Sequence, residues 1–246
     1  AGIPVAIAKQ VSKYNTLGQE ETSYYLLRKI LKLTLVLGFI FAAIMYLGAP
    51  IQAAWSGGGD DLIRVMKSLS WAVLLFPSMS VLRGFFQGFN NLKPYAMSQI
   101  AEQVIRVIWM LLTAFMIMKI GSGDYVSAVI QSTFAAFIGM IASVMVLIFF
   151  LWKEGRLQAI LSKDTEEIDI DANAIIIETV KEAIPFIITG AAIQLFQLVD
   201  QWSFINSMKL FTSHSLKELQ ILYAYLSSNP NKVTMILISL ATAIGG

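Results

Sequence analysis

Four ionisable residues lie inside long apolar segments of the chain: Arg83, Glu102, Arg106 and Asp200. An ionisable side chain at the centre of a membrane-spanning helix costs roughly 2.5–3.5 kcal/mol, so each of the four needs a partner or water. The chemistry open to them is charge pairing, recognition of an anion by guanidinium groups, and coordination of a cation by a carboxylate.

Arg83 and Glu102 are predicted to form an ion pair. Arg83 lies seven residues before Asn90 and Glu102 eight after Pro94, so on two antiparallel helices both stand ~10–12 Å from the connecting turn. Arg106 is four residues beyond Glu102 on the same helical face, where the carboxylate could be shared by two guanidinium groups. That arrangement leaves one positive charge over.

Two interpretations of these three charges remain open. In the functional one, the surplus charge belongs to a cationic wall that holds an anionic headgroup, because guanidinium forks match phosphate oxygens. In the structural one, the charges form a closed link between two helices. Both predict that loss of Glu102 is harmful, because buried cations would lose their partner.

A polar stripe on the segment 179–206 is flanked by Asp200. Its members recur at spacings of four, three and four residues: Gly190, Gln194, Gln197 and Gln201. In one interpretation Asp200, with Gln194 and Gln197 nearby, binds Na⁺ or carries a proton that drives transport. In the other, Asp200 lies ~27 Å along the helix from Glu182, near the outer membrane interface, and is merely solvated.

The composition is that of a multi-span, all-α membrane protein. Of the 246 residues, 57% are hydrophobic and 14% are charged, and the mean hydropathy is +0.68; soluble domains carry about 25% charged residues. The 18 Lys and Arg nearly balance the 16 Asp and Glu, so no basic surface for nucleic acid is expected. The chain contains no Cys and no nucleophile-elbow, Walker or HExxH motif, so neither catalytic residues nor a metal centre are expected.

Stretches without charged residues locate the membrane spans, since ~20 apolar residues cross a bilayer. We expect complete helices at 33–55, 68–89, 94–118, 125–152 and 179–206, and helices cut by the chain ends at 1–11 and from Asn231. The loop SGGGDD should separate the first two, and Pro94 suits the first position of its helix. One face of the helix 125–152 carries small residues, which should let another helix approach closely: Ala128, Ser132, Ala135, Gly139 and Ser143.

Lysine and arginine positions predict the orientation. Of the 18, ten lie in segments 1–32, 91–93 and 153–181, six lie in the opposite loops, and Arg83 and Arg106 lie within spans. The positive-inside rule places the larger set in the cytoplasm.

Two lobes are expected, separated by a polar connector with five acidic residues between Asp164 and Asp171. Residues 1–152 would form part of an N-terminal transmembrane lobe. Residues 153–174 would be a cytoplasmic acidic linker, and 175–246 the start of a C-terminal transmembrane lobe.

The run RGFFQGFNNLKPYAMSQIAEQVIRVI, residues 83–108, resembles the pattern RGxxQGxxxxxPxAxSQxxEQxxRV of the polysaccharide-transporter branch of the MATE-like flippase superfamily, which includes lipid II flippases of Gram-positive type. The segments AGIPVAIAKQVSKYN and EAIPFIITGAAIQLFQLVDQWSF are similar to the second and seventh helices of that family. The resemblance implies a two-lobe, MATE-like fold, of which this chain would be a fragment from about helix 2 to helix 8.

The resemblance also implies an activity. Members flip undecaprenyl-pyrophosphate-linked saccharides across the bacterial cytoplasmic membrane by alternating access, without making or breaking a bond. Five residues match the family motif and are the candidates for a substrate and charge network: Arg83, Gln87, Glu102, Gln103 and Arg106.

The expected partners are the lipid-linked oligosaccharide, membrane lipids and cell-wall synthesis proteins. No cofactor is expected besides Na⁺ or H⁺ as a coupling ion. Two alternatives remain: a drug/cation antiporter of the same superfamily, which should present buried acids, and a non-transporting scaffold for cell-wall synthesis, in which all buried charges satisfy one another.

Overall fold

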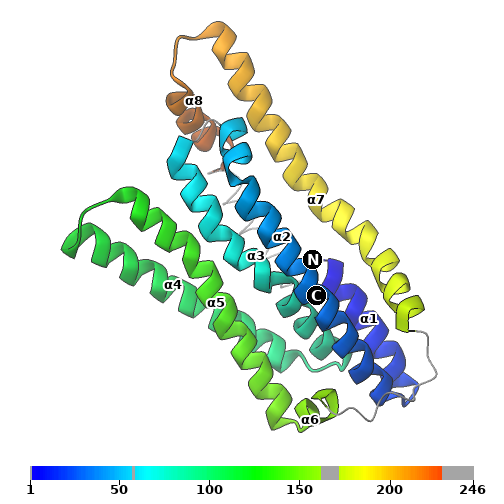
Figure 1. Cartoon of the computed structure of the whole chain (residues 1–246). Coiled ribbons are helices and arrows are strands. Elements are labelled where there is room, and N and C mark those ends of the chain that lie inside the picture. The colour runs from blue at the N-terminus through cyan, green and yellow to red at the C-terminus, as the bar shows by residue number, and fades with distance from the viewer. Residues whose placement is uncertain (1, 57–58, 162–171, 229–246) are drawn as a thin grey trace. The chain divides into compact units, whose positions relative to one another are not determined.

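The computed structural model describes residues 2–56, 59–161 and 172–228, and these residues contain helices and turns but no strand (Figure 1). This confirms the all-α prediction. The helical elements, in chain order, are α1 Gly2–Thr16, α2 Glu20–Ser56, α3 Gly59–Gly88, α4 Leu92–Phe115, the π-helical turn η1 Met116–Ile120, α5 Tyr125–Lys153, α6 Arg156–Leu161, α7 Ala172–Phe211, α8 Leu216–Tyr223 and a second π-helical turn, η3, Ala224–Ser228.

Five of these helical segments are long and apolar enough to cross a membrane, and each contains most or all of one predicted span: Glu20–Ala54, Gly59–Gly88, Leu92–Ile120, Tyr125–Lys153 and Ile177–Phe211. The five complete spans are thereby confirmed. The predicted helix from Asn231 lies outside the described residues. The chain is therefore an integral membrane protein with a multi-span helical bundle.

Helix ends differ from the sequence prediction because hydropathy marks the membrane and not the helix. Helix α2 begins at Glu20 rather than Leu33, since a charged helical turn is stable in water beyond the bilayer. Asp60 and Asp61 belong to the first turn of α3 and not to a loop, which suits the positive end of the helix dipole. Pro94 is the third residue of α4 rather than the first, and it is tolerated there because the first four N–H groups lack helical partners.

The helices pack as two neighbouring hairpins, α2 along α3 and α4 along α5, with α3 also contacting α1 and α5. Small residues set the close approaches. A Cβ built on Gly139 of α5 would lie 2.7 Å from the carbonyl oxygen of Glu102 on α4. Ala128, Ala135, Gly139 and Ser143 are buried, which confirms that the small-residue face packs inside the bundle, while Ser132 is half-buried.

Glycines of the motif allow α1 to pack against α3. A Cβ on Gly84 would lie 2.5 Å from the carbonyl oxygen of Pro4, and one on Gly88 would lie 2.5 Å from Cβ of Val11. Beside this contact lies the main hydrophobic cluster, which contains residues of α1, α2, α3, α5 and α6, among them Ile7, Leu26, Phe85, Leu147 and Ile160. This end of the bundle therefore has a densely packed core.

The chain forms two compact units, Ala1–Ile187 and Ile188–Gly246. Within the first, Lys9 Nζ lies 2.6 Å from Glu182 Oε1, so α1 contacts the N-terminal part of α7. Within the second, the Tyr223 hydroxyl donates to the carbonyl oxygen of Gln197 at 3.2 Å. Residues 162–171 of the predicted linker lie outside the described part, and the division at 153–174 stays a prediction.

Asp124 caps the N-terminus of α5, and its loss should destabilise the protein in a pH-dependent way. Its carboxylate accepts hydrogen bonds from the Ser127 hydroxyl and from the backbone N–H groups of Val126 and Ser127, which lower its pKa below the ordinary value. A lowered pKa stabilises the fold above the unfolded-state pKa, and this stabilisation is lost as the pH falls through the folded-state pKa. We expect Asp124→Ala to lower Tm by a few degrees at pH 7.

The check is a Tm series for the wild type, Asp124→Ala and Asp124→Asn across pH. The wild-type advantage over Asp124→Ala should shrink as the pH falls below about 4. Asp124→Asn keeps a capping oxygen and should lie between the two. A difference between wild type and Asp124→Ala that does not depend on pH would contradict this account.

Candidate functional site

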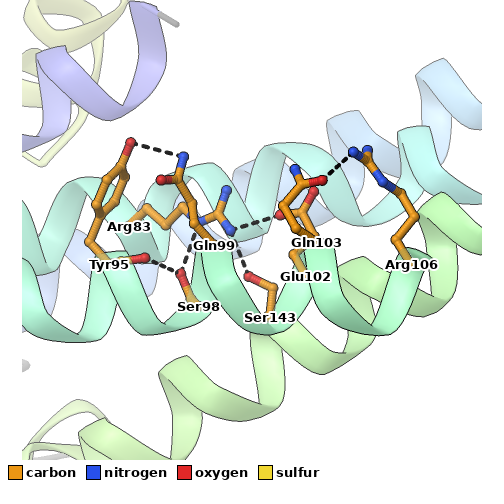
Figure 2. A network of polar contacts seen from close by, with 8 residues as sticks. All are labelled: Arg83, Tyr95, Ser98, Gln99, Glu102, Gln103, Arg106 and Ser143. Carbon is orange, nitrogen blue, oxygen red and sulfur yellow. Dashed lines mark hydrogen bonds and ion pairs between the residues drawn. The ribbon is translucent and has the colours of Figure 1, made fainter. Parts of the chain in front are cut away.

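Arg83 and Glu102 form a buried ion pair between α3 and α4 (Figure 2). The distance from Arg83 Nη2 to Glu102 Oε2 is 2.7 Å, and each side chain is 11% exposed. The pair arises from the register of the two antiparallel helices, as the sequence predicts. In a bilayer each charge would be costly alone, so each one stabilises the other.

Two serines complete the coordination of Arg83. Its Nε donates to Ser98 Oγ of α4 at 3.1 Å, and its Nη2 donates to Ser143 Oγ of α5 at 2.9 Å. The Ser98 hydroxyl in turn donates to the carbonyl oxygen of Tyr95 at 2.7 Å. One guanidinium group therefore links three helices (Figure 2).

Neither serine was predicted from the sequence to be a partner of Arg83. Ser98 belongs to the SQ pair of the motif, and Ser143 lies on the small-residue face of α5. Both were visible as polar residues within spans. A hydroxyl next to a buried arginine is the signal that could have found them, because a guanidinium group carries five donors and one carboxylate cannot accept them all.

The structure does not bring Arg106 to Glu102, which corrects the expectation of a shared carboxylate. Arg106 is half-buried, and its Nη2 instead donates to Oε1 of Gln103, which lies three residues earlier on the same helix. The Glu102 carboxylate is bonded to Arg83 of α3, whereas the Gln103 amide faces the Arg106 guanidinium group (Figure 2). Within the described ranges, Arg106 makes no ion pair.

Gln87 and Gln103 occupy different surroundings. Gln87 is half-buried in the last turn of α3, and its side chain makes no hydrogen bond within the described part of the chain. Gln103 is exposed apart from its bond to Arg106. The motif therefore divides into a buried link, which contains Arg83 and Glu102, and a more open polar pair, which contains Gln103 and Arg106.

The charges of the two groups differ. Arg83 and Glu102 neutralise each other, whereas Arg106 adds a positive charge that an amide only solvates. This surplus charge lies within a segment able to span the membrane, Leu92–Ile120. The open pair can therefore bind an anion, whereas the buried link has the geometry of a structural ion pair that holds two helices together.

The residues of α7 that were predicted to bind a cation are largely exposed. Asp200 and Gln194 are exposed and Gln197 is half-buried. In the residues that the structure describes, no group of three or more His, Cys, Asp or Glu side chains could hold a metal ion. The interpretation of Asp200 as a coupling site stays a prediction.

The helices and buried charges define the class of protein: a multi-span helical membrane protein whose span-forming hairpins are joined by an intramembrane ion pair. The chain belongs to the family described as "Polysaccharide biosynthesis protein", whose sequence model matches residues 1–246.

Three relatives come from Bacillus subtilis (strain 168). The chain is 36% identical over 253 residues to the protein named "Lipid II flippase MurJ", an alignment that covers 99% of this chain and 46% of the relative. It is 31% identical over 157 residues to "Uncharacterized membrane protein YabM", with 63% and 28% covered. It is 35% identical over 106 residues to "Stage V sporulation protein B", with 43% and 20% covered.

The chain thus spans about half the length, or less, of the curated relatives it matches. No solved structure shows significant similarity to it. The family resemblance expected from residues 83–108 is confirmed.

Proposed function

We propose that the protein containing this chain moves an undecaprenyl-pyrophosphate-linked oligosaccharide or peptidoglycan precursor across the bacterial cytoplasmic membrane by alternating access. The observation that carries the proposal is the similarity of 99% of the chain to a protein named as a lipid II flippase. The membership in a polysaccharide biosynthesis family supports the same substrate class. Such transport breaks no covalent bond, so the protein acts as a transporter and not as an enzyme.

Arg106 is the residue we propose as a contact for the pyrophosphate. It is half-buried, lies in a membrane-spanning segment and donates to an amide rather than to a carboxylate. Its remaining guanidinium donors can bind phosphate oxygens in the forked geometry that arginine provides. Gln103 orients the guanidinium group, and Gln87 is a further candidate polar contact from α3.

The Arg83–Glu102 link has a supporting role in this proposal. It joins α3 to α4, and Ser143 joins both to α5. Alternating access moves bundles of helices as rigid bodies, so helices of one bundle must stay together while the other bundle moves. A neutral, fully coordinated link inside the bundle performs this task without attracting the substrate.

Coupling to Na⁺, H⁺ or the membrane potential completes the proposal. Asp200 is the candidate residue, with Gln194 and Gln197 as neighbouring amides on α7. Exposure of Asp200 leaves its carboxylate accessible to an ion or a proton. Membrane lipids and cell-wall synthesis proteins are the partners we propose for the complete protein.

Arg106→Gln should slow flipping while leaving the fold intact. Charge-assisted hydrogen bonds contribute about 1.5–3 kcal/mol, so we expect the flipping rate to fall about tenfold or more. The measurement uses the full-length protein in liposomes that contain a fluorescent lipid-linked oligosaccharide. A quencher added outside destroys the fluorescence of the outer leaflet, and the flipping rate is the rate at which the remaining fluorescence becomes accessible to it. Lys119→Gln is the matched control, because it removes one positive charge at an exposed position in the last turn of the same helical segment, whereas Arg106 is at its middle.

Asp200→Asn is assayed in the same liposomes with and without an ion gradient. Loss of the gradient's effect, with slow gradient-free flipping retained, would support coupling through Asp200. A wild-type rate with full gradient dependence in Asp200→Asn would remove this residue from the proposal. Equal flipping rates of Arg106→Gln and Lys119→Gln at equal folded yield would contradict the proposed contact between Arg106 and the pyrophosphate.

A further inference from the structure

Two adjacent cavities lie near the end of the α2–α3 hairpin where α2 ends and α3 begins, and they share Tyr46 and Trp71. One has a volume of about 320 Å³ and an almost wholly apolar lining. The other has a volume of about 390 Å³ and contains two cationic side chains. Neither cavity includes a residue of the Arg83 link or of the Arg106 pair.

The apolar cavity opens sideways between two membrane-spanning helices. Phe39, Ala43 and Leu47 of α2 line one wall, and Leu74 of α3 lines the other. Phe39 is 68% exposed and Leu47 is 75% exposed. A cavity with this lining, open toward the hydrocarbon of the bilayer, suits an acyl chain.

The second cavity is polar and cationic. Arg64 and Lys67 of α3 and Gln131 of α5 contribute its polar groups. Lys67 Nζ lies 5.0 Å from the centroid of the Tyr46 ring, which positions the ammonium group at the boundary between the two cavities. Among the residues that the structure describes, neither Arg64 nor Lys67 makes an ion pair.

Three carboxylates lie close to Arg64 in sequence or in space, and each is at a helix N-terminus. Asp124 accepts three hydrogen bonds within the first turn of α5, and Arg64 contributes to the lowering of its pKa. Asp60 and Asp61 lie in the first turn of α3, where the helix dipole favours negative charge. Among the described residues none of the three forms an ion pair with Arg64 or Lys67, so the donors of both cations are available to another anion.

The order of the residues along α3 matches the order of groups in a phospholipid. At ~1.5 Å per residue from Gly59, Arg64 and Lys67 lie ~7 and ~12 Å into the helix, and Leu74 lies ~22 Å into it. The helix is about 45 Å long and the hydrocarbon core is about 30 Å thick, so the two cations lie near the headgroup level. The apolar cavity lies deeper, at the level of the acyl chains.

We propose that these two cavities form one binding site for an anionic phospholipid. Arg64 and Lys67 bind the phosphate, Gln131 donates to an ester or headgroup oxygen, and one acyl chain occupies the apolar cavity beside Phe39 and Leu47. The charge count along the chain places this site in the outer leaflet. The headgroup of a zwitterionic lipid would bring a third positive charge next to these two cations, so the site selects an anionic headgroup.

The experiment uses the full-length protein in phosphatidylcholine vesicles that contain a trace of photoactivatable phosphatidylglycerol or, in parallel, of photoactivatable phosphatidylcholine, each with a diazirine in the acyl chain. Crosslinked peptides are quantified by mass spectrometry. We expect phosphatidylglycerol to label segments 39–47 and 70–74 more than phosphatidylcholine does. Each of Arg64→Gln and Lys67→Gln should lower this ratio by about fivefold, because a basic residue near the surface contributes about that factor to binding of anionic lipid.

Lys119→Gln is the control for a lost positive charge outside the site and should leave the ratio unchanged. Equal labelling of the wild type by the two lipids would overturn the proposal, and this comparison needs no variant to fold. Absence of labelling on both segments would show that another helix of the full-length protein covers the apolar cavity, and this result would also overturn the proposal. A ratio that stays the same in both Arg64→Gln and Lys67→Gln would rule out the assigned phosphate contacts.

Discussion

Glu102→Gln should be the most damaging single substitution in the charge network. It leaves the Arg83 guanidinium buried among α3, α4 and α5 with no anionic partner. Removal of one member of a buried ion pair costs about 3–5 kcal/mol, which corresponds to a Tm lower by roughly 10 °C and a reduced folded yield. The measurement is the monodisperse fraction of the full-length protein after heating in detergent.

Two further variants make this test specific. Arg83→Gln combined with Glu102→Gln removes both charges and should recover most of the lost stability, because no unpaired charge remains. Glu21→Gln makes the same chemical change at an exposed position in the first turn of α2 and should have little effect. If the double variant were no more stable than Glu102→Gln, the interpretation of the pair as a neutral structural link between α3 and α4 would be contradicted.

Gly84→Ala should also destabilise the protein, for a steric reason. The new Cβ would lie 2.5 Å from the carbonyl oxygen of Pro4 and 2.9 Å from its Cα, so α1 would have to move away from α3. Overpacking of this kind costs about 1–3 kcal/mol. We expect a Tm lower by several degrees in the same heating assay.

Gly48→Ala is the matched control, because it makes the same change in α2 with only the flexible Gln52 side chain nearby, at 3.4 Å. Alanine is favoured over glycine in a helix by up to about 1 kcal/mol, so this variant should be as stable as the wild type or more stable. If Gly84→Ala were as stable as Gly48→Ala, the close packing of α1 on α3 would be wrong.

The ion pair could be predicted from the sequence because the position of one turn and the rise of a helix were enough to locate it. A tight turn at Asn90 and Asn91 fixed the antiparallel register, and helical rise then placed Arg83 and Glu102 at equal depth. The partner of Arg106 could not be predicted in this way. Residues three and four positions away are both neighbours of Arg106 on a helix. Which of Gln103 and Glu102 becomes its partner depends on tertiary packing, because Arg83 of α3 already pairs with the Glu102 carboxylate.

Spans were easier to predict than helix ends. The long uncharged runs locate the membrane-crossing part of α2 and α5, since the bilayer excludes charge. The first turns of α2 and α3 are charged and lie beyond the apolar core, so hydropathy carries no signal for them. The short α8, with a capping box formed by Ser215 and Glu218, was also missed, although its Ser-x-x-Glu spacing is a sequence signature of a helix start.

The lipid site near Tyr46 and Trp71 had no comparable signature. Gln131 of α5 lies more than sixty residues after Arg64 and Lys67 of α3 in the sequence, and their proximity follows from the packing of α3 against α5. In the sequence, Arg64 and Lys67 counted only as positive charges in an outer loop. Tertiary packing turns two loop charges into one cationic cavity.

The central claim is that the full-length protein transports a lipid carrying an anionic headgroup. The most direct test compares the wild-type protein in liposomes with two substrates, a fluorescent undecaprenyl-pyrophosphate-linked oligosaccharide and a cationic dye. We predict transbilayer movement of the oligosaccharide lipid at a rate well above that of protein-free liposomes, without uptake of the dye. Dye uptake without movement of the lipid would contradict the account in favour of an antiporter, and movement of neither substrate would contradict it in favour of a non-transporting scaffold.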